Sequence, residues 1–77
     1  MTVTVYTGPA CAYCLILKRF LEANKVKCRE IDISKDKDMK VRMQKISKQA
    51  SVPVVEVDGI VIVGYDIKKL KEALRID

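Results

Sequence analysis

The chain has 77 residues, of which 49% are hydrophobic, and carries a formal net charge of +5. A chain of this length predicts one domain, residues 1–77, with a modest core, and its apolar content excludes a disordered chain. No apolar run approaches the roughly 20 residues that cross a bilayer, so no membrane partner is expected. A nucleic-acid partner is not expected either, because the 15 basic residues are interspersed with 10 acidic ones and only 5% of residues are aromatic. The start of the chain lacks the pattern of a signal peptide, and we expect a cytoplasmic protein.

The first predicted element is a β-strand over residues 2–7, a β-branched run that ends at the turn residue Gly8. A helix over about residues 11–24 follows. Its apolar residues recur at helical spacing: Leu17, Phe20 and Leu21. Leu15 and Ile16 widen this apolar face, which indicates a helix that is covered on more than one side.

The middle of the chain predicts a second strand and a second helix. The strand covers residues 26–33, where isoleucines alternate with polar residues. The helix runs to about residue 48, and either Ser34 or Asp36 is expected to be its N-cap.

The last third of the sequence predicts a β-hairpin followed by a helix. Two β-branched runs, residues 54–57 and 60–63, flank Asp58 and Gly59, a strong hairpin signal. The helix covers residues 66–74 and is expected to turn three apolar residues inward: Ile67, Leu70 and Leu74.

The predicted order of elements is βαβαββα, an α/β arrangement. The first two strands are joined through a helix, so they should be parallel with a right-handed crossover. The hairpin adds an antiparallel pair. We therefore expect a four-stranded mixed sheet flanked by three helices.

Cys11 and Cys14 stand two residues apart, where the first strand gives way to the first helix. This spacing suits a reversible dithiol, half of a metal site or a structural disulfide. Free N–H groups and the macrodipole at a helix N-terminus favour a thiolate, so we expect the pKa of the Cys11 thiol to lie below the ordinary value of about 8.5. Cys14 lies one turn deeper, shielded yet close enough to attack a mixed disulfide on Cys11. The favoured interpretation is a dithiol with Cys11 as nucleophile and Cys14 as resolving cysteine.

The two alternatives have weaker support. A structural zinc site takes four ligands, usually cysteine and histidine, and this sequence has no histidine and one further cysteine, Cys28. A metal or iron–sulfur cluster held by Cys11 and Cys14 would need carboxylates or a second chain, as in a dimer. A disulfide across two residues closes a loop too small to add much stability. Cys28 is interpreted as a small, half-buried residue on a strand, with a secondary redox site as the alternative.

With the dithiol placed, the whole chain resembles a dithiol glutaredoxin of the thioredoxin superfamily. It is also similar to the small thioredoxin-reductase-linked redoxins of the NrdH type. Three motifs in the family's order carry the resemblance. Cys11-Ala12-Tyr13-Cys14 resembles the family's Cys-Pro-Tyr-Cys, Ser51-Val52-Pro53 its Thr-Val-Pro, and Gly64-Tyr65-Asp66 its Gly-Gly-x-Asp or Gly-Phe.

The resemblance implies a thioredoxin-like fold and a thiol–disulfide oxidoreductase that serves electron transport and cell redox homeostasis. In the family the peptide bond before the proline is cis, so the backbone of Val52 would face the first cysteine and pair with an extended substrate. Asp66 would cap the last helix and bind a charged end of glutathione. The full set of substrate- and glutathione-binding residues that the resemblance implies is Tyr13, Val52, Pro53, Gly64, Tyr65 and Asp66.

The resemblance further implies that no cofactor or metal is bound. Electrons would come from glutathione or from an NADPH-dependent thioredoxin reductase, and the partners would be disulfide-containing proteins that meet a monomer. Many glutaredoxins carry a lysine shortly before the first cysteine, which binds the glutathione carboxylate. This chain has no charged residue at positions 7–10, so the reductant stays open between the two donors.

Overall fold

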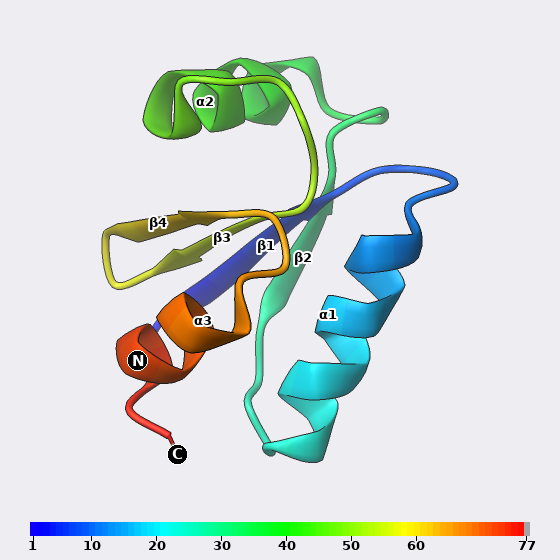
Figure 1. The fold of residues 1–77 in the computed structure, drawn as a ribbon. Coiled ribbons are helices and arrows are strands. Elements are labelled where there is room, and N and C mark those ends of the chain that lie inside the picture. Colours follow the sequence, from blue (N-terminus) through cyan, green and yellow to red (C-terminus); the bar gives the residue numbers. More distant parts are fainter. Residues whose placement is uncertain (77) are drawn as a thin grey trace.

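A computed structural model describes residues 1–76 of the chain. Over these residues it has a four-stranded sheet and three helices in the predicted order (Figure 1). The strands are β1 (Val3–Thr7), β2 (Arg29–Asp32), β3 (Val54–Val57) and β4 (Ile60–Val63), and the helices are α1 (Ala12–Ala23), α2 (Lys37–Ser47) and α3 (Ile67–Leu74). The predicted fold class, a thioredoxin-like mixed sheet flanked by helices, is confirmed.

The sheet has the strand order β2-β1-β3-β4. β1 is parallel to β2, as a connection through a helix requires, and antiparallel to β3. β3 and β4 form the predicted hairpin around Asp58 and Gly59, both of which have positive φ angles of the kind that tight hairpin turns use. The ends of β1 and β2 that follow Thr7 and Asp32 therefore lie at the same edge of the sheet.

The sheet divides the core in two. Helices α1 and α3 cover one face and α2 covers the other (Figure 1). Successive side chains of a strand point to opposite faces, so Val5 packs toward α1 and α3 whereas Tyr6 packs toward α2. The face under α1 and α3 holds the larger buried cluster: Val3, Val5, Leu17, Leu21, Val55, Val57, Ile62, Leu70 and Leu74.

A polar network ties α2 to the sheet on the second face. The Tyr6 hydroxyl donates a hydrogen bond of 3.2 Å to Glu56 and accepts one of 3.2 Å from Nε of Arg42. The Arg42 guanidinium also forms an ion pair with Glu56 at 3.1 Å. The hydroxyl of a fully buried tyrosine is thereby satisfied, which avoids the cost of an unpaired buried polar group.

An aspartate side chain is the N-cap of both α2 and α3. Asp36 accepts a hydrogen bond from the Met39 amide, and Asp66 accepts one from the Lys69 amide, each at 3.1 Å. The prediction of Asp36 as a cap is confirmed and its alternative, Ser34, is wrong. Ser34 instead donates its amide and hydroxyl to the carboxylate of Asp32, at 2.9 and 2.6 Å, in the turn before the helix.

The second strand is shorter than predicted. It begins at Arg29, so Cys28 precedes the strand and does not lie on it. The parallel register pairs Thr4 with Arg29, and β1 itself begins at Val3. In this parallel register Cys28 stands opposite Val3, the first residue of β1, so residues 26 and 27 lie beyond the start of the neighbouring strand.

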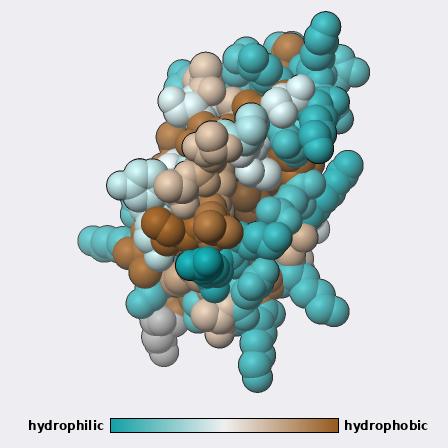
Figure 2. Space-filling view, turned by 90° about the vertical axis from the view of Figure 1, so that its right-hand side faces the viewer, coloured by the Kyte–Doolittle hydropathy of each residue, from teal (hydrophilic) through white to brown (hydrophobic). Residues whose placement is uncertain are grey.

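Two predictions of burial are wrong. Leu15 and Ile16 are 52% and 43% exposed, because α1 packs on the sheet through a single stripe and its outer face has no cover. Figure 2, which looks onto α1, shows hydrophobic residues gathered on this outer face. Ile67 is 44% exposed because the buried stripe of the short helix α3 begins only at Leu70.

Within residues 1–76, the structure contains no helix with the length and apolar character needed to cross a bilayer.

Two leucines of α1 test this packing directly. Leu17 is fully buried, so we expect Leu17→Ala to lower the free energy of unfolding by about 2–5 kcal/mol through lost contacts and a residual cavity. Leu15→Ala is the matched control and should change stability by less than about 0.5 kcal/mol. Urea unfolding followed by circular dichroism measures both. Equal losses for the two variants would contradict the packing of α1.

Candidate active site

The two cysteines lie at the start of α1, just after the loop that follows β1. Cys11 is the N-cap of α1 with an extended backbone, and its Sγ accepts a hydrogen bond of 3.1 Å from the amide of Cys14. A side-chain acceptor at this position satisfies one of the free N–H groups at the start of a helix. The predicted place of the sulfur, at the positive end of a helix, is confirmed.

Cys11 and Cys14 form a disulfide, with their Cα atoms 5.3 Å apart. This separation lies within the usual range for disulfides, about 4.4–6.8 Å. The two residues differ in exposure: Cys11 is half-buried, whereas Cys14 is 7% exposed and faces the sheet. A reagent from solvent therefore reaches Cys11 more readily than Cys14.

The segment before β3 comes beside this pair. The peptide bond between Val52 and Pro53 is cis, the isomer that the family resemblance implied. The Val52 carbonyl oxygen lies 4.0 Å from Sγ of Cys11. The Pro53 carbonyl accepts a hydrogen bond of 2.8 Å from the amide of Gly64, which joins the start of β3 to the end of β4. Four of the predicted site residues are thus linked by short contacts.

A glutamine that sequence reasoning missed holds the loop leading to Val52. The Gln49 side chain accepts a hydrogen bond of 2.6 Å from the Ser51 amide and donates one of 3.0 Å to the Ser51 carbonyl. It also donates to the hydroxyl of Ser47 at 3.0 Å. No sequence motif marks this residue, because its role depends on a loop conformation that the sequence does not display.

The motif at Gly64, Tyr65 and Asp66 has structural roles of its own. Gly64 has φ of +78°, a conformation that side-chain-bearing residues rarely adopt, which accounts for glycine there. The ring of Tyr65 packs edge-on against Phe20 of α1, with centroids 6.1 Å apart. Asp66 caps α3. None of these contacts involves the cysteines.

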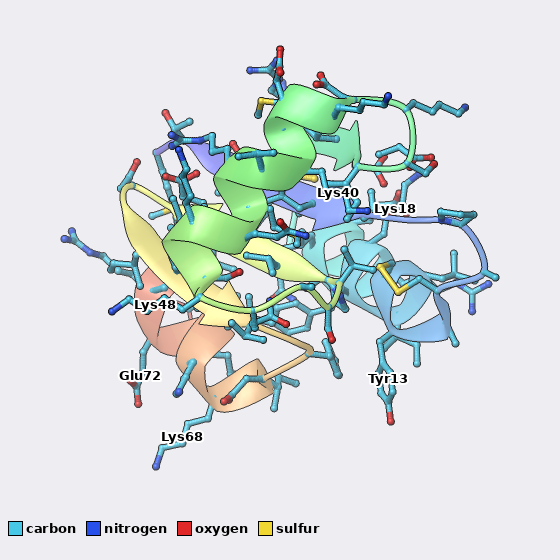
Figure 3. The ribbon with its side chains drawn as sticks, turned by 90° about the horizontal axis from the view of Figure 1, so that it is seen from above. Tyr13, Lys18, Lys40, Lys48, Lys68 and Glu72 are labelled. Carbon is cyan, nitrogen blue, oxygen red and sulfur yellow. A yellow bond between two sulfur atoms is a disulfide. The ribbon has the colours of Figure 1, made fainter. Side chains whose placement is uncertain are left out.

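Tyr13 lies in the first turn of α1, between the two cysteines in sequence. Its side chain is 63% exposed and projects from the first turn of α1 (Figure 3). Leu15 is also exposed on this helix.

A pocket of about 570 Å³ opens beside the disulfide, and sequence reasoning did not anticipate it. It contains two charged residues, Lys18 of α1 and Glu30 of β2, which form an ion pair at 3.4 Å. The spacing of Lys18, four residues after Cys14, was a usable signal, because residues at this separation share a helix face. The complete lining is Thr7, Gly8, Ala10, Cys11, Ala12, Cys14, Leu15, Lys18 and Glu30.

Cys28 is the free cysteine of the described residues. It is half-buried and packs against the core cluster under α1 and α3, which agrees with its interpretation as a packing residue. Burial raises the pKa of its thiol, and the nearby carboxylate of Glu30 adds to the effect. Residues 1–76 contain no cluster of three or more side chains suited to hold a metal ion.

Comparisons with known proteins agree with this geometry. The sequence profile described as Glutaredoxin matches residues 3–62. A glutaredoxin of Neisseria meningitidis is 36% identical over 78 aligned positions, which cover 99% of this chain and 92% of that protein. An uncharacterized glutaredoxin-like 8.6 kDa protein in the rubredoxin operon of Clostridium pasteurianum is 32% identical over 73 residues, covering 95% of this chain and 97% of that protein.

Solved structures give the same result. The glutaredoxin from Archaeoglobus fulgidus superposes with a TM-score of 0.87 at 32% identity, over 95% of this chain and 85% of that one. The thioredoxin-like protein BC3987 also has a TM-score of 0.87, at 38% identity, over 94% of this chain and 99% of that one. The thioredoxin-like fold and the disulfide-forming cysteine pair place the molecule in the class of thiol–disulfide oxidoreductases. Within that class, the chain belongs to the glutaredoxin family.

The raised pKa of Cys28 predicts a large difference in reactivity between thiols. With the Cys11–Cys14 pair left oxidised, Cys28 should react slowly with iodoacetamide at neutral pH, because few of its thiols are ionised. After reduction, Cys11 should be alkylated first. Peptide mass spectrometry of timed samples identifies the modified residue. Rapid labelling of Cys28 in the oxidised protein would contradict this assignment.

Proposed function

We propose that the dithiol reduces disulfides of proteins and mixed disulfides of glutathione. The Cys11 thiolate attacks one sulfur of the substrate, forms a mixed disulfide with it and expels the other sulfur as a thiolate. The Cys14 thiolate then attacks Sγ of Cys11, releases the second substrate thiolate and closes the Cys11–Cys14 disulfide. The substrate gains two electrons, and its two thiolates take up two protons from solvent.

One observation carries this proposal: Sγ of Cys11 is the acceptor at the start of α1. The amide of Cys14 and the helix macrodipole both stabilise negative charge on that sulfur. Compared with Cys14, Cys11 is therefore the better nucleophile and the better leaving group. The burial of Cys14 supports its role as the resolving cysteine, which needs access to Cys11 but not to solvent. Catalysis then rests on ionisation and on the alignment of three sulfurs.

The segment around Val52 is the proposed substrate platform. Its carbonyl oxygen lies beside Sγ of Cys11, so an extended peptide that is bonded to this sulfur has a backbone group within reach. Pro53 and Gly64 hold the platform through their shared hydrogen bond. We assign Asp66 to a charged end of glutathione and Tyr13 to contact with the substrate from the rim.

Regeneration needs an electron donor, for which we propose glutathione or an NADPH-dependent thioredoxin reductase. The protein would act in the cytoplasm as a monomer, without a bound cofactor, on disulfide-containing proteins. Coupled assays separate the donors. NADPH consumption is measured with glutathione and glutathione reductase in one cuvette, and with thioredoxin reductase in another.

The two cysteines should have different variant phenotypes. Cys11→Ser should abolish reduction of insulin disulfides, because the attacking sulfur is lost. Cys14→Ser should accumulate mixed disulfides with protein substrates, because nothing resolves them, while removal of glutathione from glutathionylated peptides continues through a second glutathione. Insulin turbidity and intact-mass spectrometry report the two outcomes. Disulfide reduction by Cys11→Ser at the wild-type rate would refute the proposed roles.

The proposed binding role of Asp66 can be separated from its role as a cap. Asp66→Ala and Asp36→Ala each remove one N-cap, so each should cost about 1 kcal/mol of stability. Only Asp66→Ala should also raise KM for a glutathionylated peptide, by about threefold to tenfold, because a hydrogen-bonded or ionic contact is lost. Thermal unfolding and steady-state kinetics of both variants provide the comparison. An unchanged KM would leave Asp66 as a cap alone.

A further inference from the structure

We propose that Gln49 is a positioning residue that selects peptide disulfides as substrates. Its side-chain amide holds the backbone before Val52, so a disulfide whose sulfur belongs to a peptide gains a fixed partner that a disulfide without peptide groups cannot use. This inference rests on the proposed function and concerns the same site. Gln49 is half-buried in the loop between α2 and β3. In Figure 3 this loop leaves α2 at Lys48 and runs toward the disulfide.

The Gln49 amide occupies both backbone groups of Ser51. Oε1 of Gln49 accepts a hydrogen bond of 2.6 Å from the Ser51 N–H, and Nε2 donates one of 3.0 Å to the Ser51 carbonyl. Each backbone N–H and C=O outside helices and strands needs such a partner, and here one side chain supplies both. Two hydrogen bonds to a single residue fix its orientation as well as its position, because the second bond prevents the rotation that one bond allows.

The other end of this clamp is tied to α2. Nε2 of Gln49 also donates to the hydroxyl of Ser47 at 3.0 Å, and that hydroxyl donates to the Met43 carbonyl at 2.5 Å. Met43 is fully buried in the core on this face of the sheet. A side chain that is held at both ends keeps one conformation, which is what the support of a binding group requires. The loop is thus fastened to a packed helix rather than left to follow solvent.

Val52 is the residue that this clamp presents to the substrate. It follows Ser51 directly, and its carbonyl oxygen lies 4.0 Å from Sγ of Cys11. Within residues 1–76, neither the N–H nor the C=O of Val52 pairs with another backbone group. An extended peptide can exchange two hydrogen bonds with one residue, as antiparallel strands do. Gln49 forms its hydrogen bonds with serines and not with the sulfurs, so its effect on the reaction passes through Val52.

Gln49→Met tests the proposal, because methionine keeps the length of the side chain and removes its amide. Gln44→Met is the matched control, since Gln44 is also half-buried and its side chain takes no part in the hydrogen bonds of residues 1–76. Each protein is reduced and then mixed with an excess of one of two disulfides. One is the symmetrical disulfide of a blocked, uncharged tripeptide with a central cysteine, and the other is 2-hydroxyethyl disulfide. Samples are quenched with acid, and the remaining thiols are alkylated and counted by intact-mass spectrometry.

We expect Gln49→Met to lower the second-order rate constant for the peptide disulfide by about threefold to tenfold, the size of one or two weakened hydrogen bonds. Its rate constant for 2-hydroxyethyl disulfide should stay within a factor of two of wild type, because Cys11 itself is untouched. Gln44→Met should match the wild-type protein on both substrates. A merely structural role would slow both reactions alike. A loss below threefold on the peptide, or an equal loss on both disulfides, would overturn the proposal.

Solvent exchange of the Ser51 amide, measured by NMR, checks the clamp itself. Exchange should be faster in Gln49→Met than in the wild-type protein and in Gln44→Met, and an unchanged rate would overturn the proposal. The two substrates also separate this inference from the proposed function. A wild-type protein that neither disulfide oxidises refutes the oxidoreductase. A wild-type protein that both disulfides oxidise, with Gln49→Met indistinguishable from it, refutes only the role of Gln49.

Discussion

The hydrogen bond from the Cys14 amide to Sγ of Cys11 is the interaction on which the chemistry depends. It makes a sulfur the N-cap of α1, a position usually taken by an oxygen of serine, threonine or aspartate. A neutral thiol is a weak acceptor, whereas a thiolate accepts such a bond strongly. The fold therefore gains more from this cap when Cys11 is ionised, which is the same state that disulfide exchange requires. Structural capping and the nucleophilic role that we propose for Cys11 would thus both follow from one contact.

The sheet explains why a chain this short can place the other parts of the site around that sulfur. β1 lies between β2 and β3, so it delivers Cys11 between the strand that bears Glu30 and the segment that bears Val52. One wall of the dithiol is consequently charged and open, and the other presents backbone groups.

Much of this arrangement could be predicted from sequence, because the relevant signals are local. The spacing of Cys11 and Cys14, the hairpin at Asp58 and the cap at Asp66 each depend on a few consecutive residues, and the structure has all three. Whether a residue is covered depends on distant segments. The apolar character of Leu15 indicated burial, yet no element of the described chain packs on that face of α1.

The pairing of Lys18 with Glu30 illustrates the same limit for the site. Neither residue belongs to a motif, and they meet only once the fold brings Lys18 of α1 within 3.4 Å of Glu30 of β2. Gln49 escaped notice for a related reason, since its three hydrogen bonds exist only once the loop before Val52 has its final shape. Patterns in sequence located the cysteine pair of this chain, while the contacts of Lys18, Glu30 and Gln49 emerge only from its tertiary structure.

The turn before α1 shows how the backbone, rather than any charged side chain, places the reactive sulfur. Ala10 has φ of +54°, in the left-handed region, where a residue with a Cβ is disfavoured by about 1–2 kcal/mol. The next residue, Cys11, returns to an extended conformation and aims its sulfur at the amide of Cys14. A strained residue beside a reacting atom is common at functional sites, where the surrounding structure over-determines the local geometry. Here the over-determination comes from both ends, because β1 fixes the chain before Gly8 and the stripe of α1 that includes Leu17 fixes it after Cys14. The two packed elements leave the intervening loop little freedom, and they therefore set the direction of the Cys11 sulfur even though no side chain of that loop carries a charge.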